Sequence, residues 1–271
     1  MKSIILSLVI FTTATVNAQD HTLEKIWETD SVIAVPESVL PAKKNLFVSL
    51  IDGNPWDVDG KGGVAKLGTD GSILNAAWIT GLNAPKGMGI KGNRLYVADV
   101  SQVIIIDIKN GRITGNIAIE GATGLNDITI NDKGIMYVSD SKTAKIWRIE
   151  KDVPALYLDN VKGVNGLRAV GDDLYIGAGK LFMKADANKQ LTQVAEVTQG
   201  IDGIEPVGNG DFLLTAWGGY IWYAHAGGRV ETLLETHPQK KNTADIGYDP
   251  KKRIVYVPSF FAKTVAAYRL K

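Results

Sequence analysis

Six polar side chains at matching places of a repeated pattern are the residues of this chain best suited to chemistry. Each stands ten or eleven residues before the centre of a short apolar phrase such as LYVAD (Leu95–Asp99) or MYVSD (Met136–Asp140). Three are carboxylates and two are carboxamides, which are the hard oxygen ligands that a calcium-like cation prefers. The six residues are Glu37, Lys86, Asn126, Asn165, Asp202 and Asp245.

The acidic character of this set favours a bound divalent cation. Carboxylates packed together in a poorly hydrated channel repel one another unless a cation offsets their charge. We expect calcium first, with zinc and manganese as further candidates. An alternative stays open, because Lys86 offsets part of the charge and polar residues bridged by water could simply line the channel.

The apolar phrases predict the elements that position these residues. Their centres are separated by 49, 41, 38, 38 and 43 residues, and a recurrence near forty residues with strand signals is typical of a β-propeller. A propeller brings the start of every first strand to the mouth of one channel, so the six polar residues should converge there. The centres are Phe47, Tyr96, Tyr137, Tyr175, Leu213 and Tyr256.

The two ends of the chain predict how the ring closes. After Val265–Leu270 the sixth unit is one strand short of a four-stranded antiparallel blade, while Leu23–Thr29 has no partner before the first blade. Pairing these two segments leaves no long edge strand open. The sequence therefore predicts an all-β, six-bladed β-propeller closed by an N-terminal strand that completes the last blade.

Composition sets the expected compartment and partners. Residues 1–18 read as a signal peptide and 19–271 as a single domain, which predicts an exported protein, periplasmic or secreted. Loss of Lys2 leaves 29 basic and 29 acidic residues, so nothing favours nucleic acid or, once the signal is removed, a membrane. The chain has no cysteine, which excludes disulfides, thiolate metal sites and a cysteine nucleophile. The oligomeric state is left open.

Other motifs of the chain do not indicate a functional site. The glycines of residues 87–92 match a dinucleotide fingerprint, but they lead into a strand rather than a helix, so we expect a β-turn. His21, His225 and His237 are isolated in sequence, and their spacing predicts no histidine zinc site. Trp217 and Trp222 are expected to pack between blades.

Four segments resemble the senescence-marker-protein (regucalcin) and gluconolactonase family of six-bladed propellers, with a more distant similarity to paraoxonases. They are PESVLPAKKNLFVSLID around Glu37, NDITINDKGIMYVSDS from Asn126, VNGLRAVGDDLYIGA around Asn165 and IDGIEPVGNGDFLLTAWGG around Asp202. The resemblance extends over roughly residues 36–270.

The resemblance implies roles for these residues. Glu37, Asn165 and Asp202 fall on the family's metal ligands, Asp202 also on its proton shuttle, and Asn126 on a residue that touches substrate or metal. The chain departs from the family at Gly124, where a substrate-orienting Arg is usual. The metal site is therefore expected to be kept and the sugar-recognition site to be altered.

The implied reaction is metal-dependent hydrolysis of a lactone or related ester, with a small molecule as the only partner. The cation would polarise the carbonyl and Asp202 would take a proton from the attacking water. Lys86 and Asp245 are candidate substrate contacts beside Asn126. The competing interpretation is a non-enzymatic propeller that serves as a ligand-binding or protein-interaction scaffold.

Overall fold

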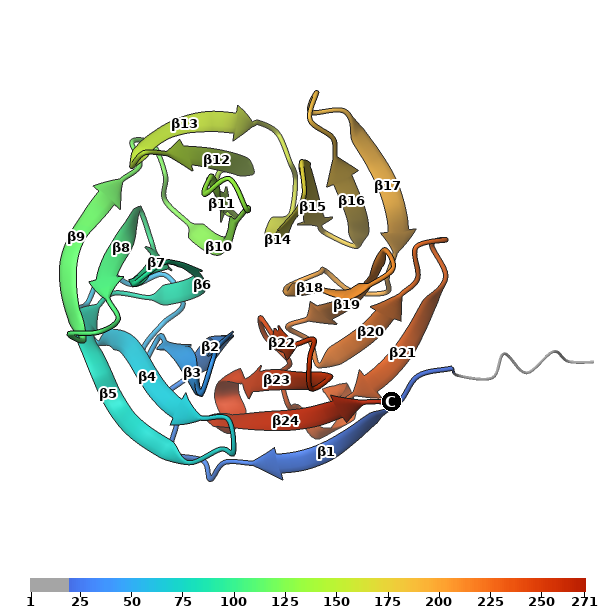
Figure 1. Cartoon of the computed structure of the whole chain (residues 1–271), viewed down its shortest axis with the longest axis horizontal. Coiled ribbons are helices and arrows are strands. Elements are labelled where there is room, and N and C mark those ends of the chain that lie inside the picture. The colour runs from blue at the N-terminus through green and yellow to red at the C-terminus, as the bar shows by residue number, and fades with distance from the viewer. Residues whose placement is uncertain (1–19) are drawn as a thin grey trace, which may run out of the picture.

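The computed structural model describes residues 20–271, which form six four-stranded antiparallel sheets arranged as blades around a channel (Figure 1). The predicted signal peptide, residues 1–18, lies outside the described residues. The innermost strand is the first of its blade in sequence, except in the sixth blade, where β1 (Leu23–Glu28) comes first in sequence but lies outermost. These inner strands are β2 (Pro36–Ala42), β6 (Pro85–Lys91), β10 (Leu125–Ile130), β14 (Val164–Val170), β18 (Ile204–Gly208) and β22 (Gly247–Asp249).

The remaining strands follow outward in sequence order in five of the six blades. Second strands, which carry the apolar phrases, are β3 (Asn45–Leu50), β7 (Arg94–Asp99), β11 (Met136–Asp140), β15 (Asp173–Ala178), β19 (Asp211–Ala216) and β23 (Ile254–Ser259). Third strands are β4 (Gly62–Gly68), β8 (Gln102–Asp107), β12 (Lys145–Glu150), β16 (Leu181–Ala185), β20 (Tyr220–Ala224) and β24 (Thr264–Leu270). Outer strands are β5 (Ile73–Leu82), β9 (Arg112–Ala118), β13 (Val153–Leu158), β17 (Leu191–Glu196), β21 (Val230–Glu235) and β1 (Leu23–Glu28).

The sixth blade closes the ring in the predicted way. Strand β1 pairs antiparallel with β24, with Leu23 opposite Leu270 and Glu28 opposite Ala266. The order of this sheet is β1-β24-β23-β22, so the N-terminal strand supplies the outer edge of the last blade. The prediction of an all-β, six-bladed propeller is confirmed.

The core lies between adjacent blades, because each blade buries both of its faces. One cluster joins Leu46 and Ala65 of the first blade to Tyr256 and Val265 of the last. All four residues are fully buried. Strand β1 adds the half-buried Trp27 to the same cluster. Closure of the ring therefore rests on apolar packing as well as on strand pairing.

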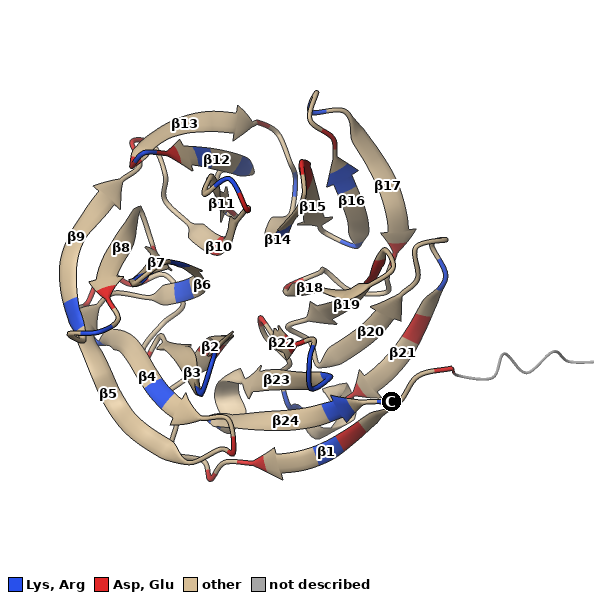
Figure 2. Cartoon of the chain, viewed as in Figure 1, with Lys and Arg blue, Asp and Glu red and all other residues tan. Residues whose placement is uncertain are grey.

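Charges of both signs are spread around all the blades (Figure 2), in keeping with a formal net charge of +1. Within residues 20–271, no helix has the length and apolar character that a membrane crossing requires.

Candidate functional site at the channel mouth

A β-bulge at the start of the inner strand displays the predicted site residues in four blades. Pairing between β2 and β3 shifts register between Pro36 and Val39, and a matching shift occurs in the next three blades. Bulges bend a strand and turn its side chains to new directions, and they are common beside active sites. The bulges contain Glu37, Lys86, Asn126 and Asn165, while Asp202 and Asp245 each lie two residues before the start of β18 and β22.

The inner strands approach one another so closely at this level that glycine is required after some site residues. A Cβ added at Gly166, which follows Asn165, would lie 2.0 Å from the carbonyl oxygen of Asp202. A Cβ at Gly203, which follows Asp202, would lie 2.7 Å from Oδ1 of Asp245. The glycines thus allow neighbouring blades to bring their site residues together at the end of the channel where the inner strands begin, which we call the channel mouth.

Asn165 and Asp202 are in direct contact. Asn165 Nδ2 donates a hydrogen bond to Asp202 Oδ1 at 2.8 Å. Burial, and next the charge of Asp245, raise the pKa of Asp202 to about 7, against the lowering effects of the Asn165 hydrogen bond and of Lys86. Asp202 can therefore exchange a proton near neutral pH.

Glu37 carries an unsatisfied oxygen next to this pair. The residue is 5% exposed, and within residues 20–271 its buried Oε2 has no hydrogen-bond partner. Burial, followed by the charge of Asp202, raises the pKa of Glu37 well above its usual range, while Lys86 opposes this. A buried carboxylate oxygen without a donor is costly, and a bound cation would satisfy it.

Lys86 lies beside the carboxylates and is held by other groups. Its Nζ donates to the carbonyl oxygens of Pro55 and Ala84 and lies 4.1 Å above the ring of Trp56. Burial lowers the pKa of Lys86, and Glu37 and Asp202 counter that effect. In the described part of the chain no ion pair within 4.0 Å joins Lys86 to a carboxylate, and its ammonium is held by backbone carbonyls and the Trp56 ring.

The two remaining predicted residues are engaged with nearby hydroxyls. Asp245 Oδ2 accepts a hydrogen bond from Ser38 Oγ at 2.5 Å, and burial raises the pKa of Asp245 to about 6. Asn126 Nδ2 donates to Ser141 Oγ at 3.0 Å. Asp245 thus acts on Asp202 through its charge. Asn126 instead makes its hydrogen bond to the loop that follows β11.

The sequence interpretation missed buried charged residues deeper in the channel. Asp127 accepts hydrogen bonds from the backbone of Ile128 and of Leu167, each at 2.6 Å, and so joins the third and fourth blades. Arg168 pairs with the buried Glu205 at 3.1 Å. These side chains line a cavity of only about 20 Å³, enough for about one water. This part of the channel therefore has no room for a larger molecule.

A second lysine lies near the position where the resemblance expects an Arg. A Cβ at Gly124 would meet Cγ of Lys142 at 2.6 Å, so the aliphatic part of Lys142 fills the space that a side chain at 124 would need. Lys142 Nζ lies 4.9 Å from the centre of the Trp56 ring, which Lys86 also contacts. Trp56 and the two lysines form a cationic and aromatic group, which we call the Trp56 cluster.

Trp217 packs against the next blade, as expected, but remains partly exposed. Trp222 is 2% exposed and packs in the core, as predicted, but Trp217 is 44% exposed on the loop after β19. Its ring lies 5.7 Å from the rings of Phe260 and Phe261. Loops between second and third strands lie at the mouth end of the ring, because the strands of a blade alternate in direction.

Comparisons with known proteins support the fold and no closer relationship. No family model matches the sequence, and no curated protein matches it. Among solved structures, a catalytically inactive virginiamycin B lyase from Staphylococcus aureus has a TM-score of 0.64 at 13% identity, over 92% of this chain and 99% of the other. A streptogramin B lyase has a TM-score of 0.65 at 11% identity, over 93% and 97% of the two chains. A luciferin-regenerating enzyme has a TM-score of 0.66 at 13% identity, over 93% and 95%.

The chain is therefore a six-bladed β-propeller. At such low identity the likeness defines the fold, and function has to be argued from the site.

Proposed function

We propose that this protein is a metal-dependent hydrolase of lactones or related esters, acting at the channel mouth, and a divergent relative of the senescence-marker-protein and gluconolactonase family. We also propose that residues 1–18 direct its export. The observation that carries the activity is the buried, unpartnered oxygen of Glu37 beside Asp202, a carboxyl whose pKa is raised to about 7. Similar propellers include several enzymes, which supports an enzymatic role.

Glu37, Asn165 and Asp202 are the residues that would hold the cation. Their donor set consists of two carboxylates and one carboxamide, which suits calcium and is acceptable to manganese or zinc. When bound, the cation would offset the carboxylate charges and polarise the ester carbonyl. Lys86 is bonded to backbone carbonyls beside the cluster, so polarising the ester carbonyl is left to the cation.

Asp202 is the proposed general base. Its carboxylate takes a proton from the water that attacks the carbonyl carbon, and a new C–O bond forms. The bond to the leaving oxygen then breaks, and the proton returns from Asp202 to that oxygen, giving a hydroxy acid from a lactone. The Asn165 hydrogen bond orients the Asp202 carboxylate for this task.

The Trp56 cluster is the proposed substrate platform, and Asn126 and Asp245 are proposed as further substrate contacts. Lys86 and Lys142 present ammonium groups over one indole ring. A lactone with an apolar face against Trp56 and acceptor oxygens toward the lysines suits this surface. Lys142 would then take the part of the missing Arg at position 124.

The test is a panel of aldonolactones, acyl lactones and aryl esters, assayed with calcium, zinc or manganese and after chelation. Replacement of Asp202 by Asn should retain the fold by circular dichroism and lower turnover by about 10²–10⁴, the usual contribution of a positioned base. The control is Asp172→Asn, because Asp172 pairs with Lys133 on the exposed surface. Unchanged turnover in Asp202→Asn would limit Asp202 to a ligand role.

One observation favours the scaffold alternative. Trp217 and Phe261 are 44% and 63% exposed and lie next to each other at the mouth end, as an apolar contact for a partner would. If no lactone or ester is turned over with any metal, the scaffold function replaces the enzymatic one.

A further inference from the structure

A second cluster of metal-binding side chains lies at the outer edge of the ring, away from the channel. His21 lies two residues before the start of β1, His225 directly follows β20, and Glu231 belongs to β21. One ligand atom from each lies within 4.8 Å of the other two. In residues 20–271 this is the one such group of three His, Cys, Asp or Glu residues.

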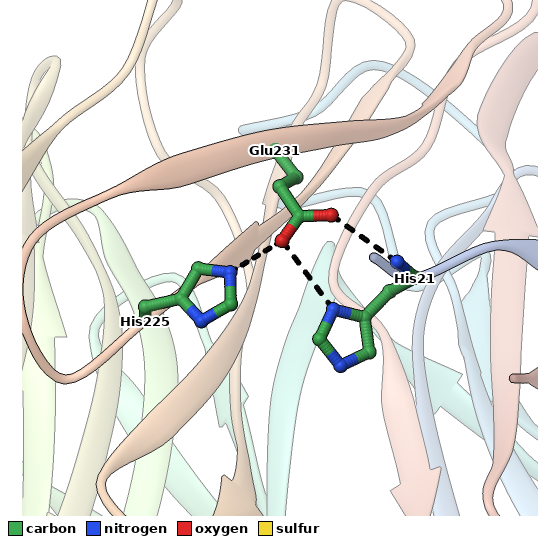
Figure 3. Close-up of side chains that lie close together, drawn as sticks. All are labelled: His21, His225 and Glu231. Atoms are coloured by element: carbon green, nitrogen blue, oxygen red, sulfur yellow. Dashed lines mark hydrogen bonds and ion pairs between the residues drawn. The ribbon is translucent and has the colours of Figure 1, made fainter. Parts of the chain in front are cut away.

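The two imidazoles converge on a single carboxylate oxygen (Figure 3). His21 Nδ1 lies 3.4 Å from Glu231 Oε1, and His225 Nε2 is hydrogen-bonded to the same atom. The other oxygen, Oε2, accepts the backbone N–H groups of Asp20 at 2.9 Å and His21 at 3.2 Å. Glu231 is thus oriented by the backbone on one side and offers its second oxygen to the histidines.

The surroundings hold the rings in place. His21 stacks on Tyr223 with 3.7 Å between ring centres and 8° between ring planes, and the His225 ring lies 4.8 Å from Tyr223. The side chains of His21 and His225 are 21% and 20% exposed, and that of Glu231 is 6% exposed. The cluster is therefore rigid and sheltered, yet an ion can reach it from solvent.

We infer that His21, His225 and Glu231 form a binding site for a divalent transition metal, zinc in the first place. Two imidazoles and one carboxylate are an established zinc ligand set, with a fourth tetrahedral position left to water. Donor atoms that share one zinc at about 2.0–2.1 Å lie roughly 3.3 Å apart, and the His21–Glu231 distance of 3.4 Å already meets this. Small side-chain rotations would open the short His225 contact, with zinc replacing the shared proton.

In the metal-free protein Arg229 occupies the Glu231 oxygen that the metal would bind, so the two compete. Its Nη2 lies 3.1 Å from Glu231 Oε1 and also pairs with Asp20. The Arg229 side chain is 46% exposed, so it can turn to solvent while keeping the Asp20 contact. The affinity for zinc should therefore rise when Arg229 is replaced by Gln.

The site would fasten the N-terminal segment to the fifth blade. Asp20 and His21 lead directly into β1, the strand that closes the sixth blade, whereas Glu231 lies in the outer strand of the fifth. A ligand that binds only the folded state stabilises it in proportion to the logarithm of its concentration. Zinc should accordingly raise the melting temperature.

The experiment is a zinc titration of the tag-free protein after chelator treatment, read by competition with a chromophoric chelator, with calcium present to occupy the channel mouth. One zinc per chain should bind, and His21→Ala and His225→Ala should each weaken it by about tenfold or more. His237→Ala is the matched control, because His237 is the third histidine of the chain and lies in the short 3₁₀ helix η1 (His237–Gln239).

Cobalt(II) provides a second readout. The wild type and His237→Ala should give the visible absorption of tetrahedral cobalt, and Arg229→Gln should bind more tightly. The proposal is overturned if zinc binding is insensitive to His21→Ala and His225→Ala, or if His237→Ala weakens it equally. It is also overturned if Arg229→Gln lowers the melting temperature but leaves zinc affinity unchanged, since Arg229 then serves a purely structural ion pair.

Discussion

At the scale of single residues, the buried carboxyl of Glu205 is one of several that should make stability depend on pH. Glu205 pairs with Arg168 at 3.1 Å, yet burial outweighs this attraction and raises the pKa of Glu205 to about 7. The folded protein thus holds the proton more tightly than the unfolded chain, where the pKa is about 4.5. The stabilisation of the folded state that Glu205 contributes is fully present below pH 4.5. It is lost as the pH rises toward 7.

We predict that the metal-free protein loses roughly 3 kcal/mol of stability from Glu205 between pH 4.5 and 7. Urea unfolding at several pH values measures this loss. Glu205→Gln should make that part of the profile shallower by this amount, because the amide does not titrate, while Asp202 and Asp245 keep the remaining slope. A profile identical in the variant and the wild type would mean that the ion pair with Arg168 offsets the burial of Glu205.

The types and spacing of the site residues predicted their positions but not their contacts. The matched spacing predicted that all six residues lie where the inner strands begin. The structure confirms these positions, at the start of the strand or just before it. The pairing of Asn165 with Asp202 joins adjacent blades, whereas the contact of Asn126 with Ser141 lies within one blade. Residue type and spacing did not distinguish between these outcomes, because both depend on side-chain rotamers.

At the scale of elements, the close approach of inner strands depends on glycine at Gly166. Its Cβ would lie 2.0 Å from the backbone oxygen of Asp202, and a backbone atom cannot move aside as a flexible side chain can. The two strands β14 and β18 would have to separate, which would also displace Asp202.

We predict that Gly166→Ala lowers the free energy of unfolding by about 1–3 kcal/mol or more, the usual cost of overpacking. Urea unfolding measures it, and turnover should fall along with stability. The control is Gly115→Ala in β9, where an added Cβ meets nothing within 4 Å. Equal effects of the two substitutions would show that the approach of β14 to β18 is not limiting.

At the scale of the whole molecule, ring closure depends on a strand taken from the other end of the chain. Strand β1 contributes Trp27 to the cluster shared by the first and last blades and covers the edge of β24. Without it, β24 becomes an open edge and the cluster loses its aromatic cover.

Deletion of residues 20–30 should therefore lower the melting temperature by about 10 °C or more, given the combined loss of the half-buried Trp27 and of the β1–β24 pairing. Differential scanning calorimetry provides the measurement. A shorter deletion of residues 20–21 removes the His21 cluster and spares β1, so it should have a smaller effect. Equal losses would assign the stabilisation to His21 and Asp20 rather than to the strand.

The sequence by itself determined the architecture. The period near forty, the apolar phrases and the surplus strand Leu23–Thr29 predicted six blades and their closure, and β1 pairs with β24 as expected. These features are readable because strand pairing within a blade is local, and because an antiparallel blade has one way to bury both faces. The start of each inner strand followed from the same reasoning.

Only the tertiary structure decided which side chains meet. His21 and His225 are 204 residues apart and looked isolated, yet ring closure places both on Glu231. Lys142 fills the space beside Gly124 because the loop after β11 lies against the segment that leads into β10. Contacts of this kind depend on how blades pack against each other and on which rotamers remain open, and no periodicity along the chain encodes either.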